Sequence, residues 1–174
     1  SKINGEIKIR ENFDRATIIK PSIIFSVDDN LSTRFMSLLS LFPFFPLYYN
    51  GSTKFTPIHA ADVAELIFNV ISKEIVSKDI EAIGPEILTF KEIIQILSKC
   101  IKKKRLLVPI PLFLAKISAM FFQLFPNPLL TIDQLRLLKY DNIKSENGIT
   151  NFDIGCPSKL YFEESVLKYS FNYT

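Results

Sequence analysis

Hydrophobic residues change their spacing along residues 54–71, from every second position to every third or fourth. Apolar side chains first alternate with Lys54 and Thr56, as in a half-buried strand at the edge of a sheet or near the strand's own end. Five apolar residues then share one helical face: Val63, Leu66, Ile67, Val70 and Ile71. At the start of that helix, Asp62 fits the N-cap position and Glu65 fits the acidic residue three positions later. The stretch predicts a strand, a tight turn and a helix, which make half of a βαβ unit.

The residues before this unit predict a helix, a strand and a second helix. Residues 2–12 have helical periodicity, residues 16–25 form a β-branched run typical of a buried parallel strand, and residues 31–41 fit a short helix. The first helix is expected to turn three apolar residues inward: Ile3, Ile7 and Phe13. The chain starts without Met or a signal-peptide pattern, and we expect it to be part of a longer protein.

The residues after the unit alternate between strand and helix patterns. Strands are expected at residues 79–84 and 106–108. Thr89 and Glu92 form a capping box for a helix with an apolar stripe of Phe90, Ile93, Ile94 and Leu97. A second capping box at Thr131 starts another helix, and a last helix is expected over residues 158–169, with Leu160, Val166 and Leu167 inward.

Two apolar runs are too short to span a membrane, for which a helix needs about 20 residues. Residues 35–49 contain Pro43 and Pro46, which prevent a continuous helix, and Asn50-Gly51 then predicts a hairpin turn. Residues 109–130 predict a helix that is apolar almost all round. Two interpretations remain open for it: core packing in a helical subdomain, or docking on a membrane surface or a hydrophobic partner, helped by the basic residues 102–105.

Composition adds few constraints. The 174 residues are 48% hydrophobic and carry a net charge of +3, which neither requires nucleic acid nor excludes a membrane surface. Cys100 and Cys156 lack metal-ligand or redox spacing, so we expect buried free thiols and no metal site. His59 with Asp62 is a candidate base with its orienting acid, but their spacing favours a local hydrogen bond or helix cap.

Six segments resemble, in order, the C-terminal half of an extended or atypical short-chain dehydrogenase: SKINGE, ATIIKPSIIF, FTPIHAADVAELI, IEAIGPEILTFKEI, RLLVPIP and PNPLLTIDQLRLLKYDN. Within these epimerase/dehydratase-like proteins, the chain is most similar to subunit nine of the alpha subcomplex of respiratory complex I and its bacterial relatives. The implied fold class is α/β, the C-terminal fragment of a Rossmann-like doubly wound parallel sheet plus a small, mostly helical C-terminal subdomain. Residues 1–84 would belong to the dinucleotide-binding domain, with 31–53 directed toward the substrate side, and 85–174 would form the docking subdomain.

The resemblance also implies site residues. Lys2 matches the lysine of the family's Tyr-x-x-x-Lys pair, which holds the nicotinamide ribose and activates the tyrosine, and that tyrosine would precede Ser1. Pro21, Ser22 and Ile23 match the loop that passes the nicotinamide end of the cofactor, NADP or NAD. The family commonly has Arg-Pro and then a glycine here, where this chain has Lys20-Pro21 and Ser26. The glycine-rich loop for the pyrophosphate is not in this chain, so the chain alone is expected to be inactive.

Two functions follow from the resemblance. The favoured one is a non-catalytic accessory or assembly factor of a respiratory membrane complex, which binds other subunits and a membrane surface through residues 106–130, without nucleic acid or metal. The other is an NAD(P)-dependent oxidoreductase, epimerase or dehydratase acting on a sugar nucleotide or a lipid-like substrate. The expected location is cytoplasmic, peripheral on the inner face of the inner membrane, or on the matrix side in mitochondria.

Overall fold

A computed structural model describes residues 2–27, 29, 31–111, 113–114 and 132–173. Its α-helices are α1 Lys2–Asn12, α2 Ser32–Leu41, α3 Ala60–Ser72, α4 Phe90–Cys100, α6 Ile132–Leu137 and α7 Phe162–Leu167. Its 3-10 helices are η1 Tyr48–Gly51 and η2 Ser170–Tyr173. Its strands are β1 Ile18–Pro21, β2 Ile24–Phe25, β3 Phe44–Leu47, β4 Lys54–Phe55, β5 Ile58–His59, β6 Asp79–Ala82, β7 Leu88–Thr89, β8 Leu106–Pro109 and β9 Ile149–Thr150.

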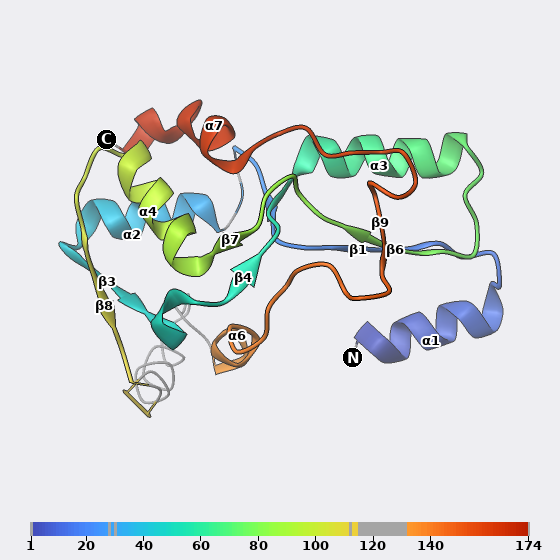
Figure 1. Cartoon of the computed structure of the whole chain (residues 1–174), viewed down its shortest axis with the longest axis horizontal. Helices are drawn as coiled ribbons and strands as arrows, with labels where there is room; N and C mark the ends of the chain where they lie inside the picture. Colours follow the sequence, from blue (N-terminus) through green and yellow to red (C-terminus); the bar gives the residue numbers. More distant parts are fainter. Residues whose placement is uncertain (1, 28, 30, 112, 115–131, 174) are drawn as a thin grey trace.

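The largest sheet in the described part of the chain is parallel, with strand order β1-β6-β9. Helix α3 lies on one side of these strands and α1 on the other (Figure 1). Leu66 and Val70 of α3 pack against Ile80 of β6 in one buried cluster. Lys20 of β1 pairs with Glu6 of α1 at 3.0 Å, which ties α1 to the sheet. Helices on both faces of a parallel sheet are the arrangement of doubly wound α/β folds.

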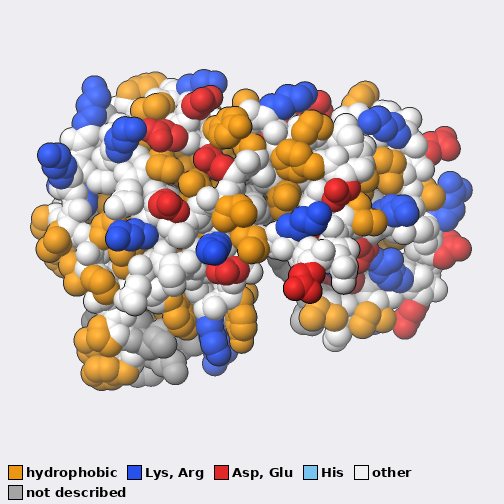
Figure 2. Space-filling model, in the orientation of Figure 1, with side chains coloured by type: hydrophobic (Ala, Val, Ile, Leu, Met, Phe, Trp, Pro, Cys, Tyr) orange, Lys and Arg blue, Asp and Glu red, His pale blue; other side chains and the backbone are white. Residues whose placement is uncertain are grey.

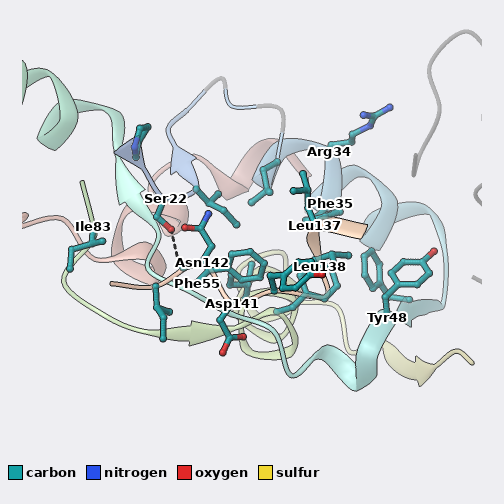
Figure 3. Close-up of a pocket in the computed structure, with 18 of the residues that line it drawn as sticks. Ser22, Arg34, Phe35, Tyr48, Phe55, Ile83, Leu137, Leu138, Asp141 and Asn142 are labelled. Atoms are coloured by element: carbon teal, nitrogen blue, oxygen red, sulfur yellow. Dashed lines mark hydrogen bonds between the residues drawn. The ribbon is translucent and has the colours of Figure 1, made fainter. Parts of the chain in front are cut away.

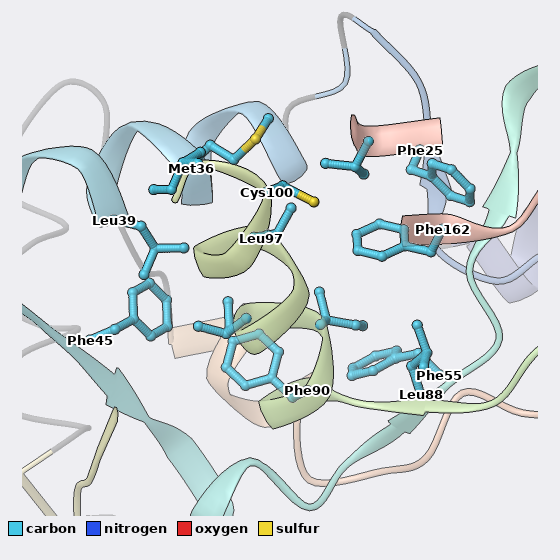
Figure 4. Packing of buried hydrophobic residues seen from close by; sticks show 14 of the residues in the cluster. Phe25, Met36, Leu39, Phe45, Phe55, Leu88, Phe90, Leu97, Cys100 and Phe162 are labelled. Atoms are coloured by element: carbon cyan, nitrogen blue, oxygen red, sulfur yellow. The ribbon is translucent and has the colours of Figure 1, made fainter. Parts of the chain in front are cut away.

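A second core surrounds α4, at the other end of the molecule from α1 (Figures 1 and 4). The predicted stripe of α4 is confirmed, since Phe90, Ile93, Ile94 and Leu97 are all buried. The capping box is also confirmed: Thr89 Oγ1 accepts a hydrogen bond from Glu92 N at 3.2 Å, and Glu92 Oε2 accepts one from Thr89 N at 2.7 Å. Helices α2 and α7 cover this core from two sides.

The run over residues 16–25 is shared between two sheets, so its prediction as one strand is wrong. Ser22 N still donates to the carbonyl oxygen of Ala82, the last residue of β6, at 3.0 Å, but the carbonyl of the next residue, Ile23, accepts from Ile58 N of β5 at 2.9 Å. The chain therefore changes neighbours at Ser22. An apolar run indicates a buried strand but does not encode which strand it pairs with.

Two helices expose apolar residues that their periodicity places inward. Ile3 and Ile7 of α1 are 68% and 50% exposed, and Phe13 just after it is exposed as well. On α3, Ile67 and Ile71 are exposed beside the buried Leu66 and Val70. The predictions of burial at these five positions are wrong for the described chain, because no described residue covers those faces.

Other element predictions are corrected where long-range contacts decide. Asn50-Gly51 turns the chain with positive φ at both residues, but no hairpin forms, since β3 pairs with β8 and β4 with β7. The last helix begins at Phe162, four residues after Ser158, and its Leu167 is exposed. The predicted capping box at Thr131 and most of the apolar helix within residues 109–130 lie outside the described residues.

Candidate functional site

The candidate site begins where β1 ends, at Pro21, Ser22 and Ile23. Ser22 is buried, and its hydroxyl accepts a hydrogen bond from Thr56 N at 3.3 Å and donates one to Asn142 O at 3.2 Å. With its amide bound to Ala82 O, Ser22 thus joins three segments that are distant in the sequence. In an open parallel sheet, the carboxyl ends of the strands are where ligands bind.

Gly84 allows the segment after β6 to pass close to this loop. A Cβ atom at Gly84 would lie 1.6 Å from the carbonyl oxygen of Pro57, and Gly84 N donates to Thr56 O at 3.1 Å. Only glycine fits at this distance, because the neighbouring atom belongs to rigid backbone. The close approach places Ile83 beside the candidate site (Figure 3).

Asp141 and Asn142 close the site from the other side. They end the last of the six segments that carry the resemblance, but no pattern in the sequence assigned them to a site. Asp141 Oδ1 accepts from Lys54 N at 2.8 Å, and Asn142 N donates to Lys54 O at 2.8 Å. Asn142 O accepts from Thr56 N at 3.2 Å as well as from Ser22. The signal available was the adjacent Asp-Asn pair, since such residues often hydrogen-bond to backbone in turns.

A cavity of about 1070 Å³ lies between these segments and α2, β3, α4 and α6. Its apolar wall includes six phenylalanine residues: Phe35, Phe42, Phe44, Phe45, Phe55 and Phe90. Its polar residues include Lys20, Ser22, Glu81, Asp141, Asn142 and Ser145. Figure 3 shows Ser22, Asn142 and Ile83 toward one end and Phe35, Leu138 and Tyr48 toward the other.

Three charged side chains of the cavity are already engaged by protein groups. Lys20 pairs with Glu6 at 3.0 Å and with Asp79 at 3.2 Å. Glu81 accepts hydrogen bonds from Ser145 N and Oγ, at 2.9 and 2.5 Å. The Asp141 carboxylate holds the backbone of Lys54. These charges fix the wall rather than offer strong unpaired sites to a charged ligand.

The predicted cofactor residues fall into two groups. Pro21, Ser22 and Ile23 all line the cavity, next to one another. Lys2 begins α1, and its side chain lies outside the described part of the structure, so its distance from the loop is not defined. Their contacts with a cofactor stay predictions.

His59 and Asp62 do not bond to each other but each holds the start of α3. His59, rather than Asp62, is the N-cap, and its Nδ1 accepts from Ala61 N at 3.1 Å. Asp62 is buried and its Oδ2 accepts from Lys159 N and Leu160 N, at 3.2 and 3.1 Å. Asp62 thereby ties the segment before helix α7 to the first turn of α3.

Two negative findings apply to the residues that the structure describes. No group of three or more His, Cys, Asp or Glu side chains among them is placed to hold a metal ion. No helix among them has the length and apolar character needed to cross a membrane.

Comparison with known proteins places the chain among relatives of a respiratory subunit, although no family model matches it. It is 26% identical over 183 aligned positions to the "NADH dehydrogenase [ubiquinone] 1 alpha subcomplex subunit 9, mitochondrial" of Arabidopsis thaliana, covering 97% of this chain and 46% of the relative. The subunit of the same name from Dictyostelium discoideum is 28% identical and is covered to 44%, with 88% of this chain aligned. These subunit 9 proteins are homologues of the chain. The chain spans about half the length of the subunit 9 relatives it matches.

Solved structures confirm the α/β, Rossmann-like fold. UDP-glucose 4-epimerase of Thermus thermophilus, in complex with NAD, matches with a TM-score of 0.64 at 10% identity, over 98% of this chain and 50% of the epimerase. The dTDP-glucose 4,6-dehydratase of Bacillus anthracis, also in complex with NAD, matches with a TM-score of 0.60 at 13% identity, over 96% of this chain and 47% of the dehydratase. At these identities the likeness concerns the fold alone.

Proposed function

We propose that the chain is the C-terminal, substrate-side half of a nicotinamide-dinucleotide-binding protein that serves as a non-catalytic accessory or assembly subunit of a respiratory complex. The observation that carries the proposal is the loop of Pro21, Ser22 and Ile23, which ends a parallel strand and opens on the cavity. That is the position at which doubly wound sheets bind ligands. The subunit 9 homologues support the respiratory partner, and the fold relatives crystallised with NAD support the cofactor.

The cofactor site would be shared between this chain and the rest of the full-length protein. The chain would supply the nicotinamide wall at Ser22 and Ile23, and Lys2 would hold the ribose. The pyrophosphate needs a glycine-rich loop at a helix N-terminus, which must come from residues outside this chain. The choice between NAD and NADP belongs to that other half as well.

Titration of NADPH and NADH into the full-length protein, followed by nicotinamide fluorescence, tests the cofactor. Ile23→Ser removes apolar contact from the wall and should weaken binding by about tenfold. Ile24→Ser is the matched control, because Ile24 is the next residue, is 41% exposed and does not line the cavity. If neither dinucleotide binds, or if both variants lose equal affinity, the cofactor proposal is refuted.

A membrane-facing surface is the second part of the proposal. Exposed apolar residues gather around β3 and β8: Leu41, Phe42, Phe44, Leu106, Val108, Phe113 and Leu114. Figure 2 shows hydrophobic side chains at the lower left, where Figure 1 places the end of β8. Lys102 and Lys104 are exposed just before β8, whereas Arg105 is turned inward, with Nε donating to Leu39 O at 2.5 Å. Apolar side chains flanked by lysines fit an anionic membrane surface.

Sedimentation with anionic vesicles tests this surface in the full-length protein. Replacing Lys102 and Lys104 with Glu should release the protein from the vesicles, because each lysine near the surface contributes about 1 kcal/mol. The same double change at Lys8 and Lys78, which are exposed at the α1 end of the molecule, is the control (Figure 1). If wild-type protein stays in the supernatant, peripheral attachment through this surface is excluded.

An NAD(P)-dependent enzyme is the second candidate function, favoured by the match of Lys2 to the catalytic pair and by the fold relatives. The residue four positions before Lys2 in the full-length protein distinguishes the two. A tyrosine there keeps proton transfer open, and any other residue supports the accessory role.

A further inference from the structure

The cavity has a composition that its position beside the cofactor loop does not explain. Six phenylalanine side chains line it, and Phe35 packs edge-on against Phe45 and Phe90, with ring centroids 5.6 and 5.7 Å apart. These contacts hold the rings of the apolar end in fixed orientations. A sugar or a diphosphate placed against them would lose hydrogen bonds to water without replacement, whereas a hydrocarbon gains about 0.8 kcal/mol for each methylene group buried.

The size of the cavity fits an extended molecule in addition to a nicotinamide ring. Its volume of about 1070 Å³ lies just above the range of roughly 300–1,000 Å³ that is usual for small-molecule sites. The cavity runs from the polar loop at Ser22 to the aromatic residues of α2, β3 and α4 (Figure 3). A ligand that fills it therefore needs a polar end and a long apolar end.

The polar end offers an amide rather than a free charge. The backbone of Asn142 is fixed by Lys54, Thr56 and Ser22, while its side-chain amide lines the cavity and has no hydrogen-bond partner in the described part of the protein. Lys20, Glu81 and Asp141 are engaged by other protein groups. The guanidinium of Arg34 extends away from the aromatic cluster (Figure 3). An amide both donates and accepts, which suits an uncharged hydroxyl or carbonyl head.

We propose that this cavity binds one amphipathic molecule with a long, flexible hydrocarbon chain, of acyl or isoprenoid type, and an uncharged polar head at Asn142. The hydrocarbon chain of the ligand lies along the phenylalanine wall, and its polar head lies beside the loop of Pro21, Ser22 and Ile23. The proposal rests on the proposed function in one respect, the assignment of that loop to the nicotinamide. It names the class of ligand that the cofactor would face.

Displacement of an uncharged fluorescent hydrocarbon probe, the methyl ester of cis-parinaric acid, from the full-length protein tests the proposal. Octanol, decanol and dodecanol should compete with affinities that rise about three- to fourfold per methylene group. Dodecanol should compete better than laurate if the head is uncharged, and comparison of farnesol with dodecanol separates an isoprenoid source from an acyl source. Affinity independent of chain length, displacement by UDP-glucose at equal concentration, or absence of probe binding would overturn the proposal.

Matched variants locate the site. Phe42→Ser and Leu137→Ser change cavity-lining residues that are 42% and 71% exposed, so the fold should persist, and probe affinity should fall about tenfold. Phe152→Ser and Leu167→Ser, at residues 41% and 50% exposed and outside the cavity lining, should leave it unchanged. Equal losses in all four variants would contradict the assignment, and thermal melting of each shows whether folding is intact.

NADPH binding measured on the same samples separates the two proposals. If the protein binds the dinucleotide but not the hydrocarbon probe, only the proposed hydrocarbon ligand is refuted. If the protein binds the hydrocarbon probe but no dinucleotide, the cofactor assignment is refuted and the cavity remains a site for a lipid chain.

Discussion

Gly84 is the residue at which the backbone around the site has no room for a side chain. Gly84→Ala should lower the free energy of unfolding by about 3 kcal/mol or more, because the added methyl would meet the Pro57 carbonyl oxygen at 1.6 Å and force the backbone apart. Urea denaturation measures the change. Gly5→Ala is the control: it has open space and a helical position, and should leave stability unchanged or raise it by about 1 kcal/mol. Similar small effects of both substitutions on the free energy of unfolding would show that Gly84 does not lie so close to the Pro57 carbonyl.

Cys100 should be the unreactive thiol of the two. Burial, followed by the charge of Glu163, raises the pKa of its thiol to about 11 from an ordinary 9.0. Because the thiolate is the reactive form, its population near pH 8 is about a hundredfold smaller than for an ordinary thiol. Iodoacetamide labelling followed by mass spectrometry should modify the half-buried Cys156 first, and Cys100 only on unfolding. Equal native labelling rates would contradict the packing of Cys100 in the α4 core.

At the scale of single elements, the capping box of α4 makes a prediction about acid. The Thr89 backbone amide, followed by its hydroxyl, lowers the pKa of Glu92 below its ordinary 4.5. A carboxyl group whose pKa is lowered on folding stabilises the folded state at pH values above its ordinary pKa. This stabilisation is lost as the pH falls through the pKa of the folded state. Thr89→Ala removes the hydroxyl, so it should lower the free energy of unfolding by about 1 kcal/mol at neutral pH and raise the pKa of Glu92.

NMR titration of Glu92 and urea unfolding measure both parts of that prediction. Thr89→Ser keeps the hydroxyl and should behave like the wild type. An unchanged Glu92 titration in Thr89→Ala would mean that the hydroxyl does not reach the carboxylate in solution.

Element predictions from the sequence succeeded where local chemistry decides. The capping box, the stripe of α4 and the extents of α1, α2 and β8 follow from residues within one or two turns of each other. They failed where a distant partner decides. The change of strand neighbours at Ser22 depends on Ala82 and Ile58, which are both distant in the sequence.

The candidate site shows the same division. The resemblance implied a cofactor role for Pro21, Ser22 and Ile23 but no role for Asn142, whose carbonyl accepts from Ser22 across 120 residues of sequence. No periodicity or spacing rule encodes such a contact. The phenylalanine wall was also missed, because its members come from α2, β3, β4 and α4 and each reads locally as ordinary core.

For the molecule as a whole, the unpaired edge of β1 points to the rest of the protein. Ile18 N and Ser22 N donate toward β6, so by strand alternation the Ile19 amide faces the edge that no described strand covers. If the rest of the protein continues the sheet there, the Ile19 amide should exchange slowly in the full-length protein and rapidly in the isolated 174-residue chain. The Lys20 amide, on the β6 side, is the internal control. Rapid exchange of Ile19 in both proteins would refute a continuous sheet.

The most direct test of the central claim is an NMR titration of NADPH into the isotope-labelled full-length protein. Nuclear Overhauser contacts are expected from the nicotinamide ring protons to Ser22 and Ile23, with shifted amides at Ile83 and none at Phe152. Dinucleotide binding that leaves Ser22 and Ile23 unperturbed, or no binding of either NADPH or NADH, would contradict the assignment of this loop to the nicotinamide.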